Sequence, residues 1–226
     1  MCHPSCIDFV KKHLEQKNVA GKSVLEVGAY NVNGTVRSVV SGMNPSSYVG
    51  VDIEMGPGVD LVCDAGRLVE RFGENAFDIL LCTEMLEHVK NWRKVVSNLK
   101  KVIKPGGLLI ITTRSKGFVY HGYPYDFWRF EITDFRDIFC DLSIESLESD
   151  PILPGVFLKA KKPVEFKENN LRNKSIYSII TESKRIEISF FDVLLFRVQC
   201  RIGPFLAKIL PSTMKSLLKN LYYRLR

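Results

Sequence analysis

Two carboxylates and one glycine in the first third of the chain have the types and spacing of a ligand site. Gly28 ends one apolar segment, Asp52 ends the next, and Asp64 follows a third. Glycine lets the backbone approach a ligand closely, and a carboxylate at the end of the neighbouring strand can accept hydrogen bonds from both hydroxyls of a ribose. The spacing therefore predicts a site for a ligand that contains a nucleoside.

Short apolar segments alternate with helical patterns over the first 160 residues. The expected strands are 23–28, 47–53, 59–63, 76–82 and 108–113, and the expected helices are 5–17, 32–40, 65–72, 91–103 and 132–139. This alternation is typical of βαβ units in a parallel sheet, where ligands bind at the carboxyl ends of the strands. Residues 142–147 and 156–160 predict a closing antiparallel hairpin.

Charge is distributed unevenly along the chain. Residues 1–160 carry 18 Lys and Arg against 20 Asp and Glu, whereas residues 161–226 carry 14 against 5. A surface that follows nucleic-acid phosphates is cationic, so we do not expect a nucleic-acid substrate for the first part. The basic block indicates either an anionic partner or a solvated helical face for the last part.

The sequence also bears on location and metal binding. No apolar run approaches the roughly 20 residues of a spanning helix, and the first residues lack the pattern of a signal peptide. We therefore expect a cytoplasmic protein. Cys2 and Cys6 flank His3, but no second Cys/His pair at ligand spacing follows, so no metal site is predicted.

Five motifs at the ends of the expected elements share one register: 25–28, 49–52, 63–65, 77–88 and 103–107. In this order and spacing they resemble class I S-adenosylmethionine-dependent methyltransferases, especially the small-molecule subgroup of ubiquinone and menaquinone type. The resemblance implies an α/β, Rossmann-like fold with a mostly parallel seven-stranded sheet and a closing antiparallel hairpin.

The resemblance also implies S-adenosylmethionine as the cofactor and gives roles to the residues of the first two motifs. Glu26 would orient the amino-acid end of the cofactor, and the backbone at Gly28 and Ala29 would pass beneath it. Asp52 would bind the ribose hydroxyls, and Ile53 would pack on the adenine.

Four further residues receive cofactor roles from the same resemblance. Asp64 would accept a hydrogen bond from the adenine amine, with the Ala65 amide nearby. Cys82 and Thr83 would line the floor beside the methylthio group. A structural alternative stays open for Asp64, because a carboxylate at this position can also cap the following helix.

Tyr30 departs from the family pattern, since it stands where a second glycine is usual. Residues 31–34 contain Asn and Gly, which tolerate positive φ and could form the turn slightly later. A nicotinamide dehydrogenase is disfavoured because G-x-G-x-x-G is absent. Tyr30 keeps open a second hypothesis, a non-catalytic binding or scaffold protein with this fold.

Four side chains are candidates for proton transfer or acceptor contact: His88, His121, Tyr123 and Tyr125. An ordinary histidine pKa of about 6.5 suits a base near neutral pH. The last three lie in the aromatic segment 114–130, which should emerge on the ligand side of the sheet as a lid or substrate wall. The alternatives are a structural role for His88 in a helical turn and simple packing of the aromatic rings.

The family pattern ends near residue 162. The predicted domains are a methyltransferase domain, residues 1–162, and a basic helical C-terminal extension, residues 163–226. An amphipathic helix is predicted from Ser212, with an apolar stripe between basic residues. Residues 188–226 could pack on the protein's own surface, form a homodimer contact, bind RNA or lie on an anionic membrane.

We therefore expect transfer of a methyl group from S-adenosylmethionine to an O, N or C atom of a small-molecule or lipid-linked acceptor. An alkyl sulfonium is already a strong methyl donor, so the protein mainly has to align the reactants and exclude water. A dedicated base is optional for an acceptor that is already nucleophilic. The sequence does not name the acceptor.

Overall fold

A computed structural model describes residues 3–122 and 125–209 of the chain. The α-helices are α1 (Pro4–His13), α2 (Gln16–Val19), α3 (Arg37–Ser41), α4 (Leu68–Phe72), α5 (Trp92–Val102), α6 (Ile132–Ile138) and α7 (Phe190–Ile209). Two 3-10 helices are η1 (Ala65–Arg67) and η2 (Leu86–His88). The strands are β1 (Ser23–Val27), β2 (Ser47–Asp52), β3 (Leu61–Val62), β4 (Phe77–Thr83), β5 (Ile103–Arg114), β6 (Trp128–Arg129), β7 (Ser143–Ser149), β8 (Gly155–Lys161), β9 (Ile176–Ser178) and β10 (Ser183–Arg185).

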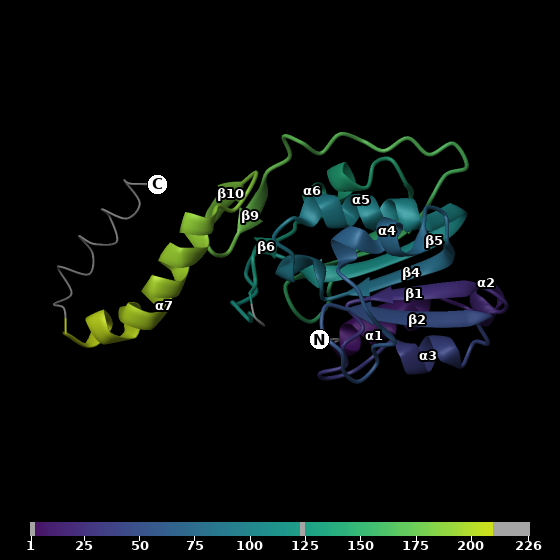
Figure 1. Cartoon of the computed structure of the whole chain (residues 1–226), viewed down its shortest axis with the longest axis horizontal. Coiled ribbons are helices and arrows are strands. Elements are labelled where there is room, and N and C mark those ends of the chain that lie inside the picture. The colour runs from purple at the N-terminus through teal and green to yellow at the C-terminus, as the bar shows by residue number, and fades with distance from the viewer. Residues whose placement is uncertain (1–2, 123–124, 210–226) are drawn as a thin grey trace. The chain divides into compact units, whose positions relative to one another are not determined.

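Seven strands form one sheet in the order β3-β2-β1-β4-β5-β8-β7 (Figure 1). The first five are parallel to one another, β8 is antiparallel to β5, and β7 is antiparallel to β8. The prediction of a mostly parallel, Rossmann-like α/β fold with a closing antiparallel hairpin is confirmed.

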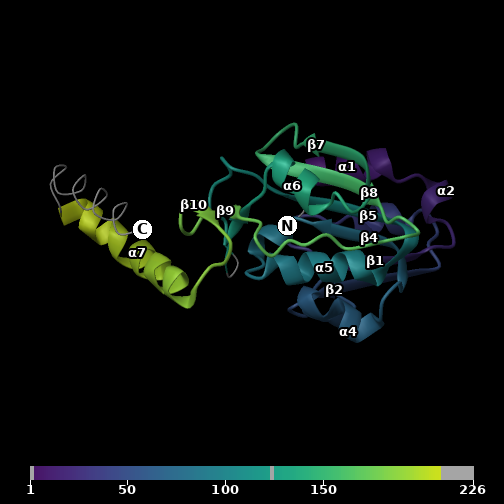
Figure 2. The same cartoon turned by 90° about the horizontal axis from the view of Figure 1, so that it is seen from above.

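Helices cover both faces of this sheet. The two views place α4 and α5 on one face and α1 on the other (Figure 1 and Figure 2). The predicted inner stripe of α5 is buried: Trp92, Val95, Val96, Leu99 and Val102. Each such side chain contributes about 1.5–3 kcal/mol when it leaves water. On the other face, Phe9 and Val10 of α1 pack against the strands in a buried apolar cluster.

The segment after β1 is less helical than the sequence predicts. A helix was expected over 32–40, whereas α3 covers only Arg37–Ser41. The reason is a local turn, because the Asn31 side chain accepts a hydrogen bond from the Gly34 amide at 2.9 Å. The turn expected within residues 31–34 therefore replaces the first part of the helix.

A second, three-stranded antiparallel sheet has the order β10-β9-β6, which the sequence did not indicate. It joins the aromatic segment to residues 176–185. Arg93 of α5 holds the chain before β9 and after β10, since its guanidinium donates to the carbonyls of Leu171, Lys174 and Ile186. The connection after β8 is thus fixed to the main sheet's helical layer.

The chain divides into two compact units, Met1–Glu187 and Ile188–Arg226. The first unit thus extends beyond residue 162, where the sequence predicted a domain boundary. Among the described residues, no helix combines the length and apolar character needed to cross a membrane. The cytoplasmic location stays a prediction, and the helix expected from Ser212 lies outside the described residues.

Candidate active site

The carboxyl ends of three neighbouring strands lie level with one another. Val27 of β1 is the partner of Val51 in β2 and of Cys82 in β4. The next residues along these strands therefore form one row, which contains Gly28 and Asp52. This row is at the edge of a parallel sheet where ligands bind.

Gly28 has a conformation and surroundings that suit only glycine. Its φ is +83°, and a Cβ atom there would lie 2.7 Å from the Met85 Cβ. The amides of Gly28 and Ala29 both donate to the Val51 carbonyl, at 3.0 and 3.1 Å. The turn is consequently fixed to β2, and internal packing alone already requires a glycine.

Asp52 is held by the backbone on both sides of its carboxylate. Oδ2 accepts from the Tyr30 amide at 3.1 Å, and Oδ1 accepts from the Ile53 amide at 2.7 Å. Each oxygen keeps a second lone pair, which is what two ribose hydroxyls would need. The Ile53 side chain is 60% exposed beside it and offers an apolar surface for a flat ring.

Tyr30 is accommodated by a second loop rather than by a change at Asp52. Its ring lies on Gly56, where a Cβ atom would come within 2.2 Å of Tyr30 Cε2. The neighbouring Asn31 amide donates to the Pro57 carbonyl at 2.8 Å. The residue that departs from the family pattern therefore leaves the Asp52 carboxylate in place, and its amide helps to hold it.

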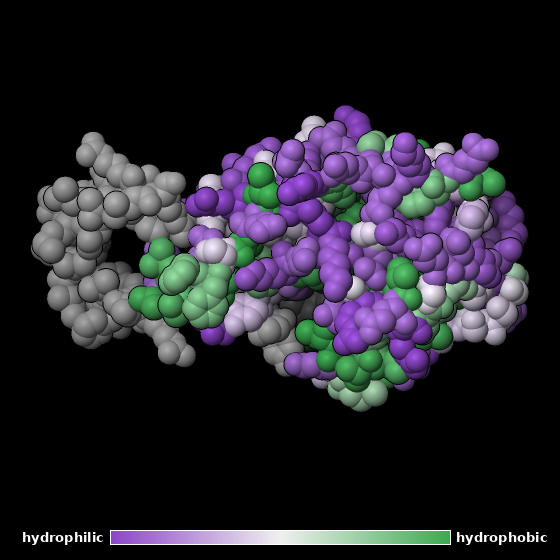
Figure 3. Space-filling model, turned by 45° about the horizontal axis from the view of Figure 1, so that its top comes forward, coloured by the Kyte–Doolittle hydropathy of each residue, from purple (hydrophilic) through white to green (hydrophobic). Residues whose placement is uncertain are grey.

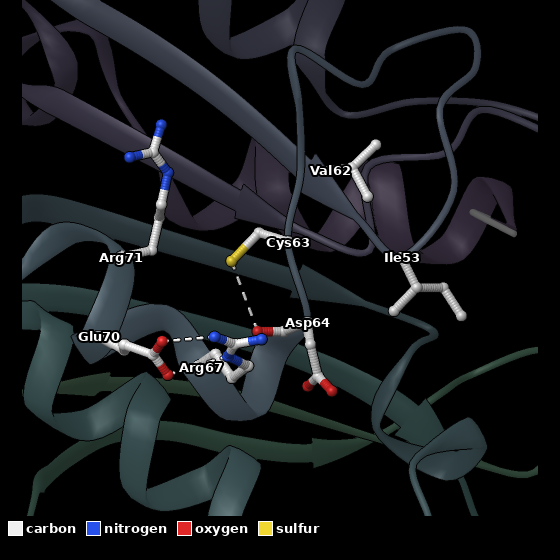
Figure 4. A pocket seen from close by; sticks show the side chains of 7 residues that line it. All are labelled: Ile53, Val62, Cys63, Asp64, Arg67, Glu70 and Arg71. Carbon is white, nitrogen blue, oxygen red and sulfur yellow. Dashed lines mark hydrogen bonds and ion pairs between the residues drawn. The ribbon is translucent and has the colours of Figure 1, made fainter.

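Asp64 and Ala65 follow β3, and Asp64 borders a hollow of about 480 Å³. Figure 4 shows Asp64 and Ile53 among its lining residues, with Arg67 paired to Glu70. The Asp64 carboxylate accepts from the Gly66 amide at 2.6 Å, so it caps η1 as the structural alternative proposed. Its remaining acceptor capacity is available at the wall of the hollow.

Glu26 is buried in β1 with one hydrogen-bond donor close to it. The Tyr48 hydroxyl donates to Glu26 Oε2 at 2.7 Å. Burial raises the pKa of Glu26 to about 7, although the hydrogen bond from Tyr48 lowers it. The carboxyl group is therefore close to its titration midpoint at neutral pH and would respond to a cationic ligand group.

Cys82 and Thr83 end β4 and are buried. Burial raises the pKa of the Cys82 thiol well above its ordinary value, and the nearby Glu87 adds to this shift. The thiol is thus a neutral, apolar group at working pH. Both residues are thus buried at the strand end where the sequence predicts the floor of the site.

The aromatic segment is organised by a buried ion pair. Both Asp126 and Arg129 are about 1% exposed or less, and the guanidinium donates to the two carboxylate oxygens at 2.5 and 2.6 Å. Arg129 also donates to the carbonyls of Phe118 and Val119 at 3.1 and 2.9 Å. One buried cation therefore fixes the path of the segment across the site.

His121 is held in this segment between two carboxylates. Its Nδ1 lies 2.8 Å from Asp126 Oδ2, and its Nε2 lies 3.7 Å from Glu87 Oε1. Burial lowers the pKa of His121, but the two carboxylates outweigh that effect and raise it to about 9. His121 is therefore an imidazolium at neutral pH, which suits charge stabilisation and disfavours a role as a base.

His88 has the opposite character. Its Nδ1 lies 2.6 Å from the Tyr125 carbonyl, which can only accept, so Nδ1 carries the hydrogen. Burial lowers the pKa of His88. The neutral ring thus has an unprotonated Nε2, 4.0 Å from Glu87 Oε1, and can take up a proton.

The structure brings the predicted histidines together but not every predicted residue. The ring centroids of His88 and His121 are 4.8 Å apart, and the ring planes are inclined at 67°. Tyr125 contributes its carbonyl oxygen to His88, and its ring lies 5.5 Å from that of Phe127. Tyr123 lies outside the described residues.

Glu84 and Glu87 are buried carboxylates that the sequence analysis did not select. Thr113 donates to Glu87 Oε2 at 2.8 Å. Burial raises the pKa of Glu87, but the nearby His121 and His88 outweigh that effect and lower it to about 2. Glu84 has a positive φ of +52° and pairs with the Arg114 guanidinium. Burial and the nearby Glu87 raise the pKa of Glu84 well above its ordinary value.

The positions of Glu84 and Glu87 in the sequence could have indicated a place in the site. Both glutamates lie in the segment 83–88, directly after the β4 strand whose end was assigned to the cofactor. Carboxylates at the carboxyl end of a parallel strand face the ligand edge. A second hollow, of about 210 Å³, is bordered by Glu84, Arg114, Phe118 and His121.

Glu87, His88 and His121 also form a group that could hold a metal ion. One ligand atom from each lies within 4.8 Å of the others. His88 Nδ1 donates to the Tyr125 carbonyl, and His121 Nδ1 lies at ion-pair distance from Asp126, so the Nε2 atoms are the ones left for a metal ion. The sequence analysis predicted no metal site. This group could not be seen in the residue spacing, since His121 reaches it from a distant segment of the chain.

Comparisons with known proteins place this site in a family. A family model described as a methyltransferase domain matches residues 3–149. Among curated proteins, the ubiquinone biosynthesis O-methyltransferase of Chromobacterium violaceum is 28% identical over 127 residues, which cover 50% of this chain and 52% of that protein. The protein of the same name from Pseudomonas syringae pv. tomato is 31% identical over 113 residues, covering 44% and 47%.

Solved structures share the fold at low sequence identity. The 1,6-didemethyltoxoflavin-N1-methyltransferase of Burkholderia thailandensis has a TM-score of 0.56 at 14% identity, covering 71% of this chain and 77% of that one. The cyclase SpnF has a TM-score of 0.55 at 16% identity, covering 70% and 80%. The chain spans about half the length of the curated relatives it matches. Because the family model covers most of the chain, the protein belongs to the methyltransferase-domain family.

Proposed function

We propose that the protein transfers a methyl group from S-adenosylmethionine to an O, N or C atom of a small-molecule or lipid-linked acceptor. The observation that carries this proposal is the row of strand ends, in which backbone-held Asp52 and the Gly28 turn lie at the same edge of the sheet as Glu87 and His88, which follow β4. Relatives named as O-methyltransferases support a hydroxyl acceptor.

The strand-end residues would hold the cofactor along the edge of the sheet. Asp52 would accept from both ribose hydroxyls, and Ile53 would cover one face of the adenine. Asp64 would reach the adenine amine from the wall of the larger hollow. Glu26 would compensate the charge of the cofactor's ammonium group, for which its pKa of about 7 leaves it responsive.

The acceptor would occupy the smaller hollow, which His121 borders, and would reach towards the His88 ring, 4.8 Å from that of His121. When bound, S-adenosylmethionine supplies an electrophilic methyl group. His88 Nε2 would remove the proton from an acceptor hydroxyl or amine, because its tautomer leaves that nitrogen free. The imidazolium of His121 would stabilise the negative charge that develops on the acceptor atom.

Calorimetry with S-adenosylmethionine and S-adenosylhomocysteine on the full chain tests the cofactor half. We expect both to bind and Asp52→Ala to weaken binding at least about 100-fold, since two hydrogen bonds to a charged group are worth about 1.5–3 kcal/mol each. Asp8→Ala, on the exposed outside of α1, is the matched control and should bind like the wild type. Absence of binding, or equal binding by Asp52→Ala, contradicts the proposal.

Production of S-adenosylhomocysteine with a panel of small phenols and amines tests the acceptor half. His88→Gln should lower kcat at least about 100-fold with the cofactor affinity unchanged, which is within the range of general-base catalysis. Cofactor binding without turnover of any panel member, in the presence of added divalent cations, would favour the non-catalytic binding protein instead.

A further inference from the structure

The first three turns of α7 present an exposed apolar face. Five large apolar side chains there are between 42% and 77% exposed: Phe190, Phe191, Leu194, Leu195 and Val198. Their spacing of one, three and four residues places them on one side of an α-helix. In Figure 3 the part of α7 that is not grey is largely green, whereas the visible face of the first unit is mostly purple.

The N-terminus of α7 is capped by the side chains of Ser189 and Asp192. The Ser189 amide and hydroxyl both reach Asp192 Oδ2, at 2.8 and 2.7 Å, and the Asp192 amide donates to Ser189 Oγ at 3.1 Å. This reciprocal cap satisfies amides of the first turn. The two phenylalanines of that turn are therefore displayed by a fixed helix end.

The charge of this unit indicates what covers the apolar face. Residues 188–226 contain seven Lys and Arg and one acidic residue, Asp192, whereas residues 1–160 are slightly acidic. A second copy of the unit would bring two such cationic segments together, and a nucleic acid would leave the phenylalanine and leucine face without an apolar partner. An anionic lipid surface satisfies both features, since it offers headgroup charge and an acyl boundary.

We propose that α7, Phe190–Ile209, is a docking element for the surface of anionic membranes. The helix α7 would lie in the plane of the interface with the face of Phe191 and Leu194 towards the acyl chains. Each nearby Lys or Arg adds about 1 kcal/mol of attraction to an anionic surface. Docking would bring the site of the first unit to acceptors that are dissolved in, or linked to, lipid, and this last step alone rests on the proposed function.

Flotation of the full chain with vesicles tests the docking element. We expect binding to vesicles that contain phosphatidylglycerol, little binding to pure phosphatidylcholine, and release by high salt, because exposed charges are screened. Phe191→Ser should lower the partition constant about tenfold or more, the effect of removing one large apolar side chain from the interface. The matched control is Val164→Ser, which removes an apolar side chain that is 82% exposed in the first unit and should not change binding.

Three results would overturn the docking element. They are equal binding to neutral and anionic vesicles, equal binding by Phe191→Ser, and a dimer without vesicles that Phe191→Ser dissociates. Affinity for S-adenosylmethionine, measured on the same variants, separates the two proposals. Loss of vesicle binding with normal cofactor affinity leaves the methyltransferase intact, and loss of cofactor binding with normal flotation leaves the docking element intact.

Discussion

The cofactor half and the acceptor half of the site are built in different ways. At the cofactor half, backbone amides hold Asp52, and a glycine with positive φ makes the turn, all within about 30 residues of the chain. At the acceptor half, buried side chains instead hold the site residues in place. His121 contacts Glu87 and Asp126, and Arg129 ties the whole segment down.

The difference teaches where each half is vulnerable. Backbone hydrogen bonds survive most substitutions, so the cofactor half should fail only where a side chain clashes or a ligand contact is lost. Buried charges depend on one another, because removal of one leaves another without compensation in a medium of low polarity. The acceptor half should therefore fail as a unit.

The largest effect is expected at the buried ion pair. Asp126→Asn leaves the Arg129 guanidinium without its carboxylate at about 1% exposure, so the free energy of unfolding should fall by about 3–5 kcal/mol. Chemical denaturation followed by far-UV circular dichroism measures this loss. Affinity for S-adenosylmethionine should change much less as long as the protein stays folded.

Asp137→Asn is the matched control for that prediction. Asp137 pairs with Lys174 at 2.6 Å, but its side chain is 63% exposed, so its loss should cost below about 1 kcal/mol. Similar losses for the two variants would show that burial of the Asp126 pair is not what stabilises the aromatic segment.

The next largest effect is expected at the turn of the cofactor half. Gly28→Ala combines a positive φ, which costs about 1–3 kcal/mol, with a clash against Met85 that adds about 1–3 kcal/mol. Gly73→Ala has the same φ of +83° with no atom within 4 Å of the new Cβ, so it should show only the first cost. Thermal unfolding compares the two, and equal losses would exclude the clash with Met85.

The contrast between the two halves also explains how far the sequence could lead. The strands could be predicted because buried parallel strands are continuous apolar runs, and Gly28, Asp52 and Asp64 stand directly at their ends. Each of these positions depends on local chain geometry. The sequence could therefore predict these strand ends residue by residue, and their roles towards a cofactor stay a prediction.

The acceptor half could be predicted only in part. His88 and His121 were selected as separate candidates, but nothing in the spacing shows that Glu87 and His121, 34 positions apart, would meet. The opposite pKa shifts of the two histidines depend on Asp126 and on the Tyr125 carbonyl, which only the folded segment brings into place. The β6-β9-β10 sheet was missed for the same reason, since its short strands pair over about 50 residues.

Opposite pH dependences should distinguish the two histidines. The pKa of His121 is raised to about 9 by folding, so its contribution to stability is fully present below about pH 6.5 and is lost as the pH rises through 9. His121→Gln should remove at most about 3 kcal/mol of such pH-dependent stability. Denaturation of wild type and variant between pH 6 and 10 measures the difference.

His88→Gln should act with the opposite sign. The pKa of His88 is lowered by burial, so its neutral form favours folding above about pH 6.5, and that stability is lost as the pH falls below this value. Removal of the side chain should flatten the acid side of the stability profile, whereas His121→Gln flattens the alkaline side. Profiles that change in the same direction would contradict the separate roles of the two rings.

The smallest effect is expected at Glu26, where the cofactor half does depend on a buried charge. If the carboxylate form binds the ammonium group of S-adenosylmethionine, a pKa of about 7 makes binding about tenfold tighter at pH 8 than at pH 6, and about one proton is released per cofactor bound at pH 6. Calorimetry in two buffers of different ionisation enthalpy counts that proton. Glu26→Gln should bind more weakly with no such pH dependence, while Glu15→Gln, at an exposed position before α2, should keep it. A wild-type affinity that is constant between pH 6 and 8 would contradict this prediction. It would mean that ionisation of Glu26 is not linked to cofactor binding and that the ammonium group is bound elsewhere along the strand ends.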